Sequence, residues 1–217
     1  LNYYLKYNFV PSPLSIYESI YKLEPSTFLI TSKRNKKINL EKYWHHNNEV
    51  ENHKIDKQNN LSQYADQLES IIKESVNLQS KADVPIGTFL SGGIDSTLIT
   101  ALLSNVSTKS VNTFTIGFYE KFFDESNYAK QISKYLHTDH NEVFFTSSDA
   151  LNIIPKLSKI YCEPFSDKSQ LPTFLLSNFA SNNVKTVLSG DGADELFGGY
   201  NRYIFAKKIL HLQKKLP

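Results

Sequence analysis

Two glycine-rich loops with acidic and hydroxyl side chains are the segments of this chain best suited to chemistry. Each follows a hydrophobic run, one within residues 84–96 (VPIGTFLSGGIDS) and one within residues 184–199 (VKTVLSGDGADELFGG). Both patterns predict a strand that ends in a Ser-Gly turn and leads into an acidic helix start. Backbone amides of such loops bind phosphate and carboxylates bind metal ions. We therefore predict one site for nucleotide chemistry, assembled at the end of a sheet.

The first loop, residues 91–96 (SGGIDS), combines conformational freedom with hydrogen-bond donors. Gly92 and Gly93 have no Cβ, so both can take positive φ and bring N–H groups against a bulky anion. Asp95 is expected to cap the helix that follows. The hydroxyl donors nearby are Ser91, Ser96 and Thr97. The loop matches neither Gly-x-x-x-x-Gly-Lys-Ser/Thr nor Gly-x-Gly-x-x-Gly, and taken alone it could be an ordinary strand-to-helix turn.

The second loop, residues 188–200 (LSGDGADELFGGY), carries three acidic side chains, Asp191, Asp194 and Glu195. They are candidates for metal binding or catalysis. The alternative is that they only favour the positive end of the following helix.

The two loops together resemble a known family. SGGIDS looks like the pyrophosphate loop of the ATP pyrophosphatase superfamily, and the second loop is similar to the signature of the synthetase domain in the asparagine synthase family. Between the loops, residues 113–118 (TFTIGF), Asp124-Glu125, His140 and residues 163–165 (EPF) follow in the order that this family shows. The resemblance covers most of the chain.

The resemblance implies an ATP site built from both loops, with Mg²⁺ as cofactor. ATP-binding roles are implied for Leu90, Ser91, Gly92, Gly93, Asp95, Ser96, Ile116, Ser189 and Gly190. The phosphates would lie on the first loop, and the adenine and ribose would lie against Leu90, Ile116 and the Ser189-Gly190 turn. Asp95 and Asp194 would share one Mg²⁺. Asp191 is the implied catalytic residue.

Three further residues are implied on the substrate side, namely Asp167, Ser169 and Gly192. A plain turn explains Asp167 and Ser169 equally well.

The implied activity is the ATP-dependent amidation of L-aspartate to L-asparagine through β-aspartyl-AMP, with release of AMP and pyrophosphate and with nitrogen from glutamine or ammonia. The alternatives are a related amidotransferase for another carboxylate in a surface-polysaccharide pathway, another adenylating ligase, a tRNA-thiolating enzyme, and an inactive nucleotide-binding fragment.

The order of expected elements predicts an α/β fold with a parallel sheet covered by helices on both faces. The expected strands are residues 84–90, 111–118, 141–145 and 184–188, and the expected helices are residues 61–80, 95–104, 124–136, 171–180 and 200–216. A helical stretch over residues 148–162 should be interrupted at Pro155. The resemblance implies an adenine nucleotide alpha hydrolase-like sheet whose first and fourth strands are neighbours, which places Asp95 and Asp194 on facing loops.

Three regions are expected along the chain. Residues 1–46, with a hairpin over residues 27–44, resemble the C-terminal remnant of a glutaminase (Ntn amidotransferase) domain, residues 47–60 form a linker, and residues 61–217 form the ATP-binding domain, truncated at its C-terminus. The family's N-terminal cysteine nucleophile and its later catalytic lysine are both missing. We therefore expect an internal fragment of a larger enzyme, weak or inactive by itself.

The composition of the chain indicates which classes of partner the protein binds. A net charge of +2 gives no case for nucleic acid, and no apolar stretch approaches the length of a bilayer span. The single cysteine, Cys162, excludes an intramolecular disulfide framework and is expected to be a buried apolar residue. We expect a cytoplasmic protein that acts on small molecules (aspartate, ATP, and glutamine or ammonia), and the resemblance allows a homodimeric parent.

Overall fold

The computed structural model of this chain describes residues 1–34, 37–45, 60–122 and 124–213. Residues 47–59 of the expected linker lie outside the described residues. The chain divides into two compact units, one formed by Leu1–Asp66 with Ala150–Leu171 and the other by Gln67–Asp149 with Pro172–Pro217. The division into glutaminase remnant, linker and ATP-binding domain stays a prediction.

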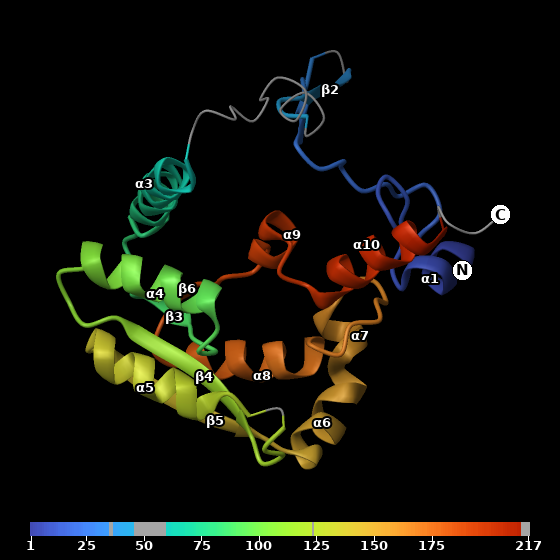
Figure 1. Cartoon of the computed structure of the whole chain (residues 1–217). Coiled ribbons are helices and arrows are strands. Elements are labelled where there is room, and N and C mark those ends of the chain that lie inside the picture. Colours follow the sequence, from blue (N-terminus) through green and yellow to red (C-terminus); the bar gives the residue numbers. More distant parts are fainter. Residues whose placement is uncertain (35–36, 46–59, 123, 214–217) are drawn as a thin grey trace. The chain divides into compact units, whose positions relative to one another are not determined.

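The second unit contains a parallel sheet of four strands in the order β5-β4-β3-β6 (Figure 1). The strands are β3 (Ile86–Phe89), β4 (Asn112–Phe118), β5 (Asp139–Phe145) and β6 (Thr186–Leu188). Every strand lies inside or within two residues of its expected range. The expected neighbourhood of the first and fourth strands is confirmed, since β3 pairs with β6 in parallel from Ile86 opposite Thr186.

Helices cover both faces of this sheet, as predicted. On one face, α3 (Leu61–Gln79) and α4 (Ile94–Val106) pack in a core of Val76, Leu102, Leu103, Val111 and Leu188. On the other face, α8 (Gln170–Ala180) packs in a core of Phe114, Leu176, Ala180 and Val184. Burying this apolar surface supplies the main driving force for the fold.

The strands alternate between an apolar face and a threonine-rich face. Phe114 of β4 packs edge-on against Phe179 of α8, with ring centroids 6.1 Å apart. Thr113, the preceding residue, points the other way, and its hydroxyl lies 3.1 Å from the Thr138 hydroxyl. Thr88 of β3 is likewise fully buried, 3.0 Å from the Thr100 hydroxyl of α4. The hydroxyls of Thr88 and Thr113 thus both have partners, which avoids the cost of an unpaired polar group at these two positions.

The remaining elements of the second unit flank the two glycine-rich loops. α5 (Ser126–Leu136) follows β4, α9 (Ala193–Phe197) follows β6, and α10 (Asn201–Gln213) comes last. No helix among the described residues is long and apolar enough to span a membrane.

The first unit contains the expected hairpin, in which β1 (Thr27–Thr31) pairs antiparallel with β2 (Ile38–Lys42). The helical stretch near Pro155 is broken as predicted into α6 (Ser147–Ile153), a 3₁₀ turn over Ile154–Lys156 and α7 (Leu157–Ile160). Helix α1 (Asn2–Tyr7) was not expected from the sequence.

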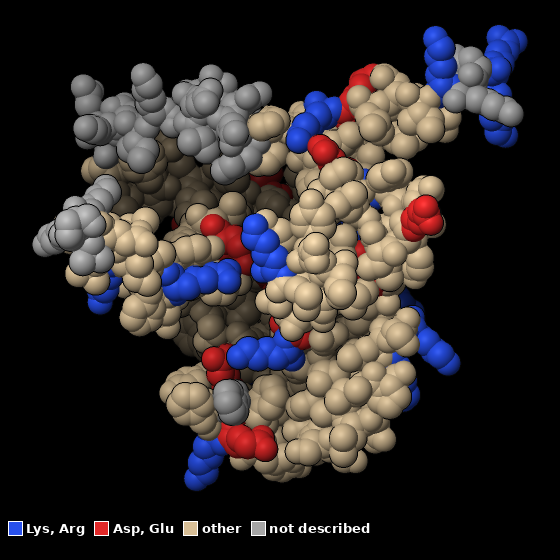
Figure 2. All heavy atoms as spheres, turned by 90° about the vertical axis from the view of Figure 1, so that its right-hand side faces the viewer, with Lys and Arg blue, Asp and Glu red and all other residues tan. Residues whose placement is uncertain are grey.

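Charged side chains of both signs lie at the surface. On the face drawn in Figure 2, acidic and basic side chains are interspersed among uncharged ones, which agrees with a net charge of only +2. The expected burial of Cys162 is wrong: the residue is exposed, and it lies at a bend in the irregular segment after α7.

Candidate functional site

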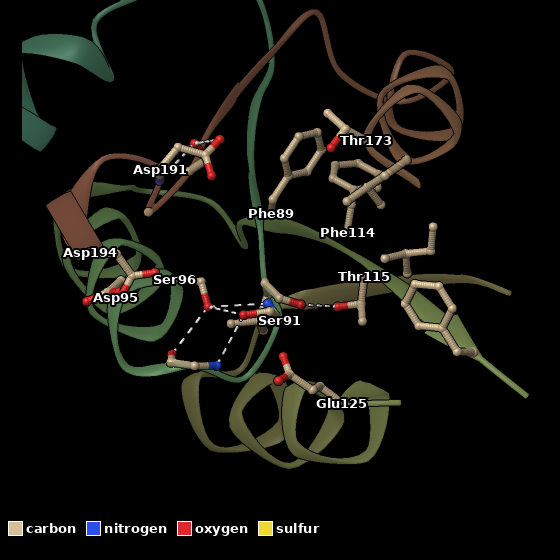
Figure 3. Close-up of a pocket in the computed structure, with 17 residues that line it drawn as sticks. Phe89, Ser91, Asp95, Ser96, Phe114, Thr115, Glu125, Thr173, Asp191 and Asp194 are labelled. Atoms are coloured by element: carbon tan, nitrogen blue, oxygen red, sulfur yellow. Dashed lines mark hydrogen bonds between the residues drawn. The ribbon is translucent and has the colours of Figure 1, made fainter. Parts of the chain in front are cut away.

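A pocket of about 340 Å³ lies where β3, β4 and β6 end at their carboxyl edge (Figure 3). Parallel α/β sheets bind ligands at this edge, where the strand order reverses. All residues that line the pocket belong to the second unit. They are Phe89, Leu90, Ser91, Gly93, Asp95, Ser96, Phe114, Thr115, Ile116, Phe118, Glu125, Thr173, Leu176, Ser189, Gly190, Asp191 and Asp194.

The first loop is held in shape by its own serine hydroxyls. The Ser91 N–H donates to Ser96 Oγ at 3.2 Å, the Gly93 N–H donates to Ser91 Oγ at 3.2 Å, and the two serine hydroxyls lie 3.0 Å apart. The loop is therefore preorganised, which reduces the entropy that ligand binding would cost.

Helix α4 begins differently from the sequence-based expectation. Its N-cap is Gly93, with φ −70° and no side-chain cap, whereas Asp95 lies within the first turn. The expected capping role of Asp95 is thus wrong, because the chain enters the helix two residues earlier. The first amides of α4 consequently keep no side-chain cap, which suits an anion-binding helix start.

The two glycines of this loop meet different demands. Gly92 has φ +89°, and a Cβ there would lie 2.7 Å from the Tyr128 Cβ and 2.9 Å from the Ala129 amide nitrogen. Gly93 has no positive φ, so the expected left-handed freedom is used at Gly92 alone. A Cβ on Gly93 would meet only Ser91 Oγ, at 3.3 Å, and Gly93 lines the pocket while Gly92 does not. Gly92 therefore serves packing and Gly93 keeps the pocket open.

The second loop touches the first at Gly190. A Cβ on Gly190 would lie 2.9 Å from the Asp95 Cβ and 2.9 Å from the Ser96 amide nitrogen. Next to this contact, Ser189 Oγ donates to Asp191 Oδ2 at 3.0 Å. The absence of a side chain at residue 190 is thus what lets the two loops form one pocket.

Four carboxylates line the pocket, those of Asp95, Glu125, Asp191 and Asp194. Among the described residues that line it, none is Lys or Arg. In the described part of the chain, no three His, Cys, Asp or Glu side chains gather closely enough to hold a metal ion by themselves. A cation here would need ligand oxygens or water in addition to the protein carboxylates.

Glu125 lines the pocket but was not predicted as a site residue. The hydrogen bonds of the preceding residue, Asp124, explain its position. The Asp124 carboxylate accepts hydrogen bonds from the N–H groups of Phe118 and Ser126 and from the Ser126 hydroxyl. Burial raises the pKa of Asp124, but these hydrogen bonds outweigh it, so the pKa lies below its ordinary value. Asp124 thus organises the start of α5, and Glu125 is left to face the pocket.

The floor of the pocket is apolar and was also missed. Phe89, Phe114 and Leu176 line it beside the expected Leu90 and Ile116. Their alternation along β3 and β4 predicts a buried face, but only the packed fold shows that this face continues into the pocket.

Two hydrogen bonds hold the backbone of Leu90 against β4. Thr115 Oγ1 donates to the Leu90 carbonyl at 2.5 Å, and the Leu90 N–H donates to the Phe114 carbonyl at 2.9 Å.

The remaining expected residues lie outside the lining. Gly192 has φ +90° and is the N-cap of α9. Asp167 and Ser169 belong to the first unit, where Asp167 Oδ1 accepts 2.8 Å hydrogen bonds from the N–H and the hydroxyl of Ser169. These bonds lower the pKa of Asp167. The substrate-side roles of Asp167, Ser169 and Gly192 stay predictions.

Comparison with known proteins decides the family. The family model described as asparagine synthase matches residues 67–217, which include the whole sheet and both glycine-rich loops. The chain belongs to the asparagine synthase family.

Individual members of the asparagine synthase family match nearly the whole chain. A Methanocaldococcus jannaschii relative named after the glutamine-hydrolysing asparagine synthetases is 36% identical over 217 residues, which is 99% of this chain and 40% of the relative. Asparagine synthetase [glutamine-hydrolyzing] 1 of Bacillus subtilis is 32% identical over 203 residues, 94% of this chain and 31% of its own length. The chain thus spans less than half of either relative.

A solved structure, the NH3-dependent NAD synthetase of Campylobacter jejuni, matches with 16% identity and a TM-score of 0.43 over 63% of this chain and 60% of its own. Similarity at this level is too low to bear on function.

Proposed function

We propose that the protein activates the side-chain carboxylate of aspartate with ATP and transfers ammonia to it, forming asparagine. Family membership supports this reaction class. The observation that carries the proposal is the pocket in which Gly190 seats the second loop against Asp95 and Ser96 of the first. It offers serine hydroxyls, carboxylates and the uncapped N-terminus of α4 to one ligand.

ATP would bind with its phosphates on the first loop. Ser91, Gly93 and Ser96 line the pocket at the start of α4, a helix of 13 residues whose N-terminal amides favour anions. The adenine would lie against the apolar floor near Leu90 and Ile116, and the ribose near Ser189-Gly190. Gly92 would act indirectly, because it shapes the loop and does not line the pocket.

The charge of the pocket supports a divalent cation as part of this site. A polyphosphate would meet four carboxylates and no lining Lys or Arg, and such an arrangement is repulsive without a bound cation. Carboxylate oxygens are suitable Mg²⁺ ligands, and we infer that Asp95 and Asp194 would hold the ion. When bound, the ion would neutralise charge on the phosphates.

In the proposed reaction the protein positions ATP, aspartate and ammonia, and no protein side chain forms a covalent bond with them. A β-carboxylate oxygen of aspartate would attack the α-phosphorus of ATP while the bond from that phosphorus to the pyrophosphate oxygen breaks, giving β-aspartyl-AMP and pyrophosphate. Ammonia would then attack the acyl carbon, AMP would leave, and the nitrogen would lose a proton to give asparagine. Aligning the reactants can account for much of such a rate enhancement.

The proposed role of Asp191 follows from its position in the pocket. Asp191, held by the Ser189 hydroxyl, lines the pocket and is proposed to assist formation of the intermediate. Substrate-side roles remain proposals for Asp167, Ser169 and Gly192. Glutamine is the proposed nitrogen source of the complete enzyme, as the printed names of the relatives indicate for those proteins.

Aspartate-dependent ATP–pyrophosphate exchange tests this function in the full-length protein. Exchange should require L-aspartate, should not occur with L-glutamate, and should fall by about 10²-fold in Asp191→Asn. ATP binding by that variant serves as the control and should persist. Exchange with a different carboxylate but not with aspartate would reject aspartate as the substrate.

A further inference from the structure

The turn after α9 folds back onto one of the pocket carboxylates. Helix α9 ends at Phe197, and its C-cap Gly198 has φ +71° and donates its N–H to the Asp194 carbonyl. The N–H of Gly199 donates to the same carbonyl at 3.1 Å. The backbone of residue 199 therefore passes directly alongside Asp194.

Gly199 packs so closely on the Asp194 side chain that no Cβ fits. A Cβ built on Gly199 would overlap Asp194 Oδ1 and would lie 3.1 Å from its Cγ and 3.4 Å from its Cα. Backbone conformation is not what requires glycine here, because Gly199, unlike Gly198, is not among the residues with positive φ. A side chain at this position would have to displace the Asp194 carboxylate.

Neighbouring side chains fix the turn against α9. Tyr200 Oη donates to Glu195 Oε1 at 2.7 Å. The Arg202 guanidinium lies 4.1 Å from the centroid of the Tyr200 ring and 5.5 Å from that of Tyr203. A hydrogen bond to a carboxylate and cation–π contacts both restrict the turn. The Gly199 peptide thus has little freedom to yield if Asp194 is pushed.

We propose that Gly199 is a positioning residue that acts through Asp194. Its bare Cα lets the Asp194 carboxylate keep the orientation in which it lines the pocket together with Asp95 (Figure 3). This inference rests on the function proposed above, in which these two carboxylates hold Mg²⁺ for ATP. A methyl group at residue 199 would turn the carboxylate and weaken Mg²⁺-dependent ATP binding.

Two adjacent glycines provide a matched pair of variants. Gly199→Ala should raise the Mg²⁺ concentration needed for half-maximal ATP binding by about tenfold, the usual scale for residues that orient a metal ligand. Gly198→Ala is the control: its Cβ would meet only Tyr203 Cδ2 at 4.0 Å, but its positive φ is strained. This control should lower the thermal midpoint and leave the Mg²⁺ requirement unchanged.

A thermal unfolding cycle without nucleotide tests the contact independently. Gly199→Ala should lower the midpoint in the unmodified chain, or prevent folding, but should have no effect in an Asp194→Ala background, where the clashing carboxylate is gone. An equal loss in both backgrounds would overturn the proposal, as would an unchanged Mg²⁺ requirement in Gly199→Ala. If the unmodified chain binds no ATP with Mg²⁺, the proposed function fails instead, and the thermal cycle still decides whether Asp194 excludes a side chain at residue 199.

Discussion

At the residue scale, the first glycine-rich loop separates a packing role from a binding role in two consecutive positions. Gly92 is pressed against Tyr128 and Ala129 at a positive φ, whereas a Cβ on Gly93 would meet only Ser91 Oγ, at 3.3 Å, and Gly93 lines the pocket. Substitutions at the two positions should therefore have different effects, on the stability of the fold at Gly92 and on ligand binding at Gly93.

We predict that Gly93→Val abolishes ATP binding while the circular dichroism spectrum stays that of the unmodified chain, because the added side chain fills space meant for phosphate. Gly92→Ala should instead lower the free energy of unfolding by roughly 2 kcal/mol, from the clash with α5 and the strained φ. Denaturant unfolding and calorimetric ATP titration of both variants measure these effects. Equal ATP affinity in Gly93→Val and the unmodified chain would rule out a phosphate role for this loop.

Two acidic residues, one from each loop, should act on the same ion. If Asp95 and Asp194 share one Mg²⁺, Asp95→Asn and Asp194→Asn should each weaken Mg²⁺-dependent ATP binding, and the double variant should lose little more than either single variant. Titrations with Mg²⁺ at fixed ATP measure this. Losses that add in full would show that the two carboxylates have separate roles.

At the element scale, each part of the pocket is supplied by the segment that follows a strand. The loops after β3 and β6 meet at Gly190, and the start of α5 after β4 brings in Glu125. That start is organised by Asp124, whose carboxylate accepts three hydrogen bonds from Phe118 and Ser126.

We predict that Asp124→Ala lowers the free energy of unfolding by about 1 kcal/mol, the usual scale for the loss of hydrogen bonds such as those from Phe118 and Ser126. Because the folded-state pKa of Asp124 is lowered, its contribution is present above the pKa of the unfolded chain and is lost as pH falls through the folded pKa. Denaturant unfolding at neutral and acidic pH checks both points. A cost that stays the same once the pH has fallen below the folded pKa would contradict the role of the ionised carboxylate.

Much of this arrangement could be predicted from the sequence, because strands and helices that alternate along the chain carry strong periodic patterns. The strands at residues 86–89 and 112–118, and the break at Pro155, all fall where the pattern puts them. Local details, such as which residue caps a helix, could not be predicted because tertiary contacts determine them. Asp95 has the type of a helix cap, yet the N-cap of α4 is Gly93. Glu125, the N-cap of α5, lines the pocket next to Asp124, whose carboxylate accepts the Ser126 N–H.

At the scale of the whole molecule, a buried hydrogen-bond network joins β4, β5 and α5 away from the pocket. Thr138 Oγ1 donates to Ser133 Oγ at 2.9 Å, Thr113 Oγ1 lies 3.1 Å from Thr138 Oγ1, and it also lies 3.0 Å from His140 Nδ1. Glu142, at 3.8 Å from His140 Nε2, and Lys130, at 3.7 Å from Glu142, are the charged groups that face this histidine.

Burial lowers the pKa of His140 below its ordinary value, and the nearby Glu142 only partly offsets this. Above about pH 6.5 the histidine is neutral in both the folded and the unfolded chain, so its titration does not lower the free energy of unfolding there. As pH falls below that value, the unfolded chain takes up a proton first, so the free energy of unfolding should decrease until the folded pKa is passed. Unfolding measured from pH 8 to pH 5 should show this decrease, and His140→Gln should lack it. An identical slope in the variant would assign the decrease to other groups.

In the proposed function, the two glycine-rich loops form a single site for ATP with Mg²⁺. Gly190→Ala tests whether they do, because a methyl group there would collide with Asp95 and Ser96 and separate the loops without removing any proposed ligand group. Calorimetric titration of the unmodified chain with ATP should show saturable binding that requires Mg²⁺, and Gly190→Ala should lose it while its circular dichroism spectrum is retained. Absence of binding by the unmodified chain, or equal affinity in Gly190→Ala, would contradict the account.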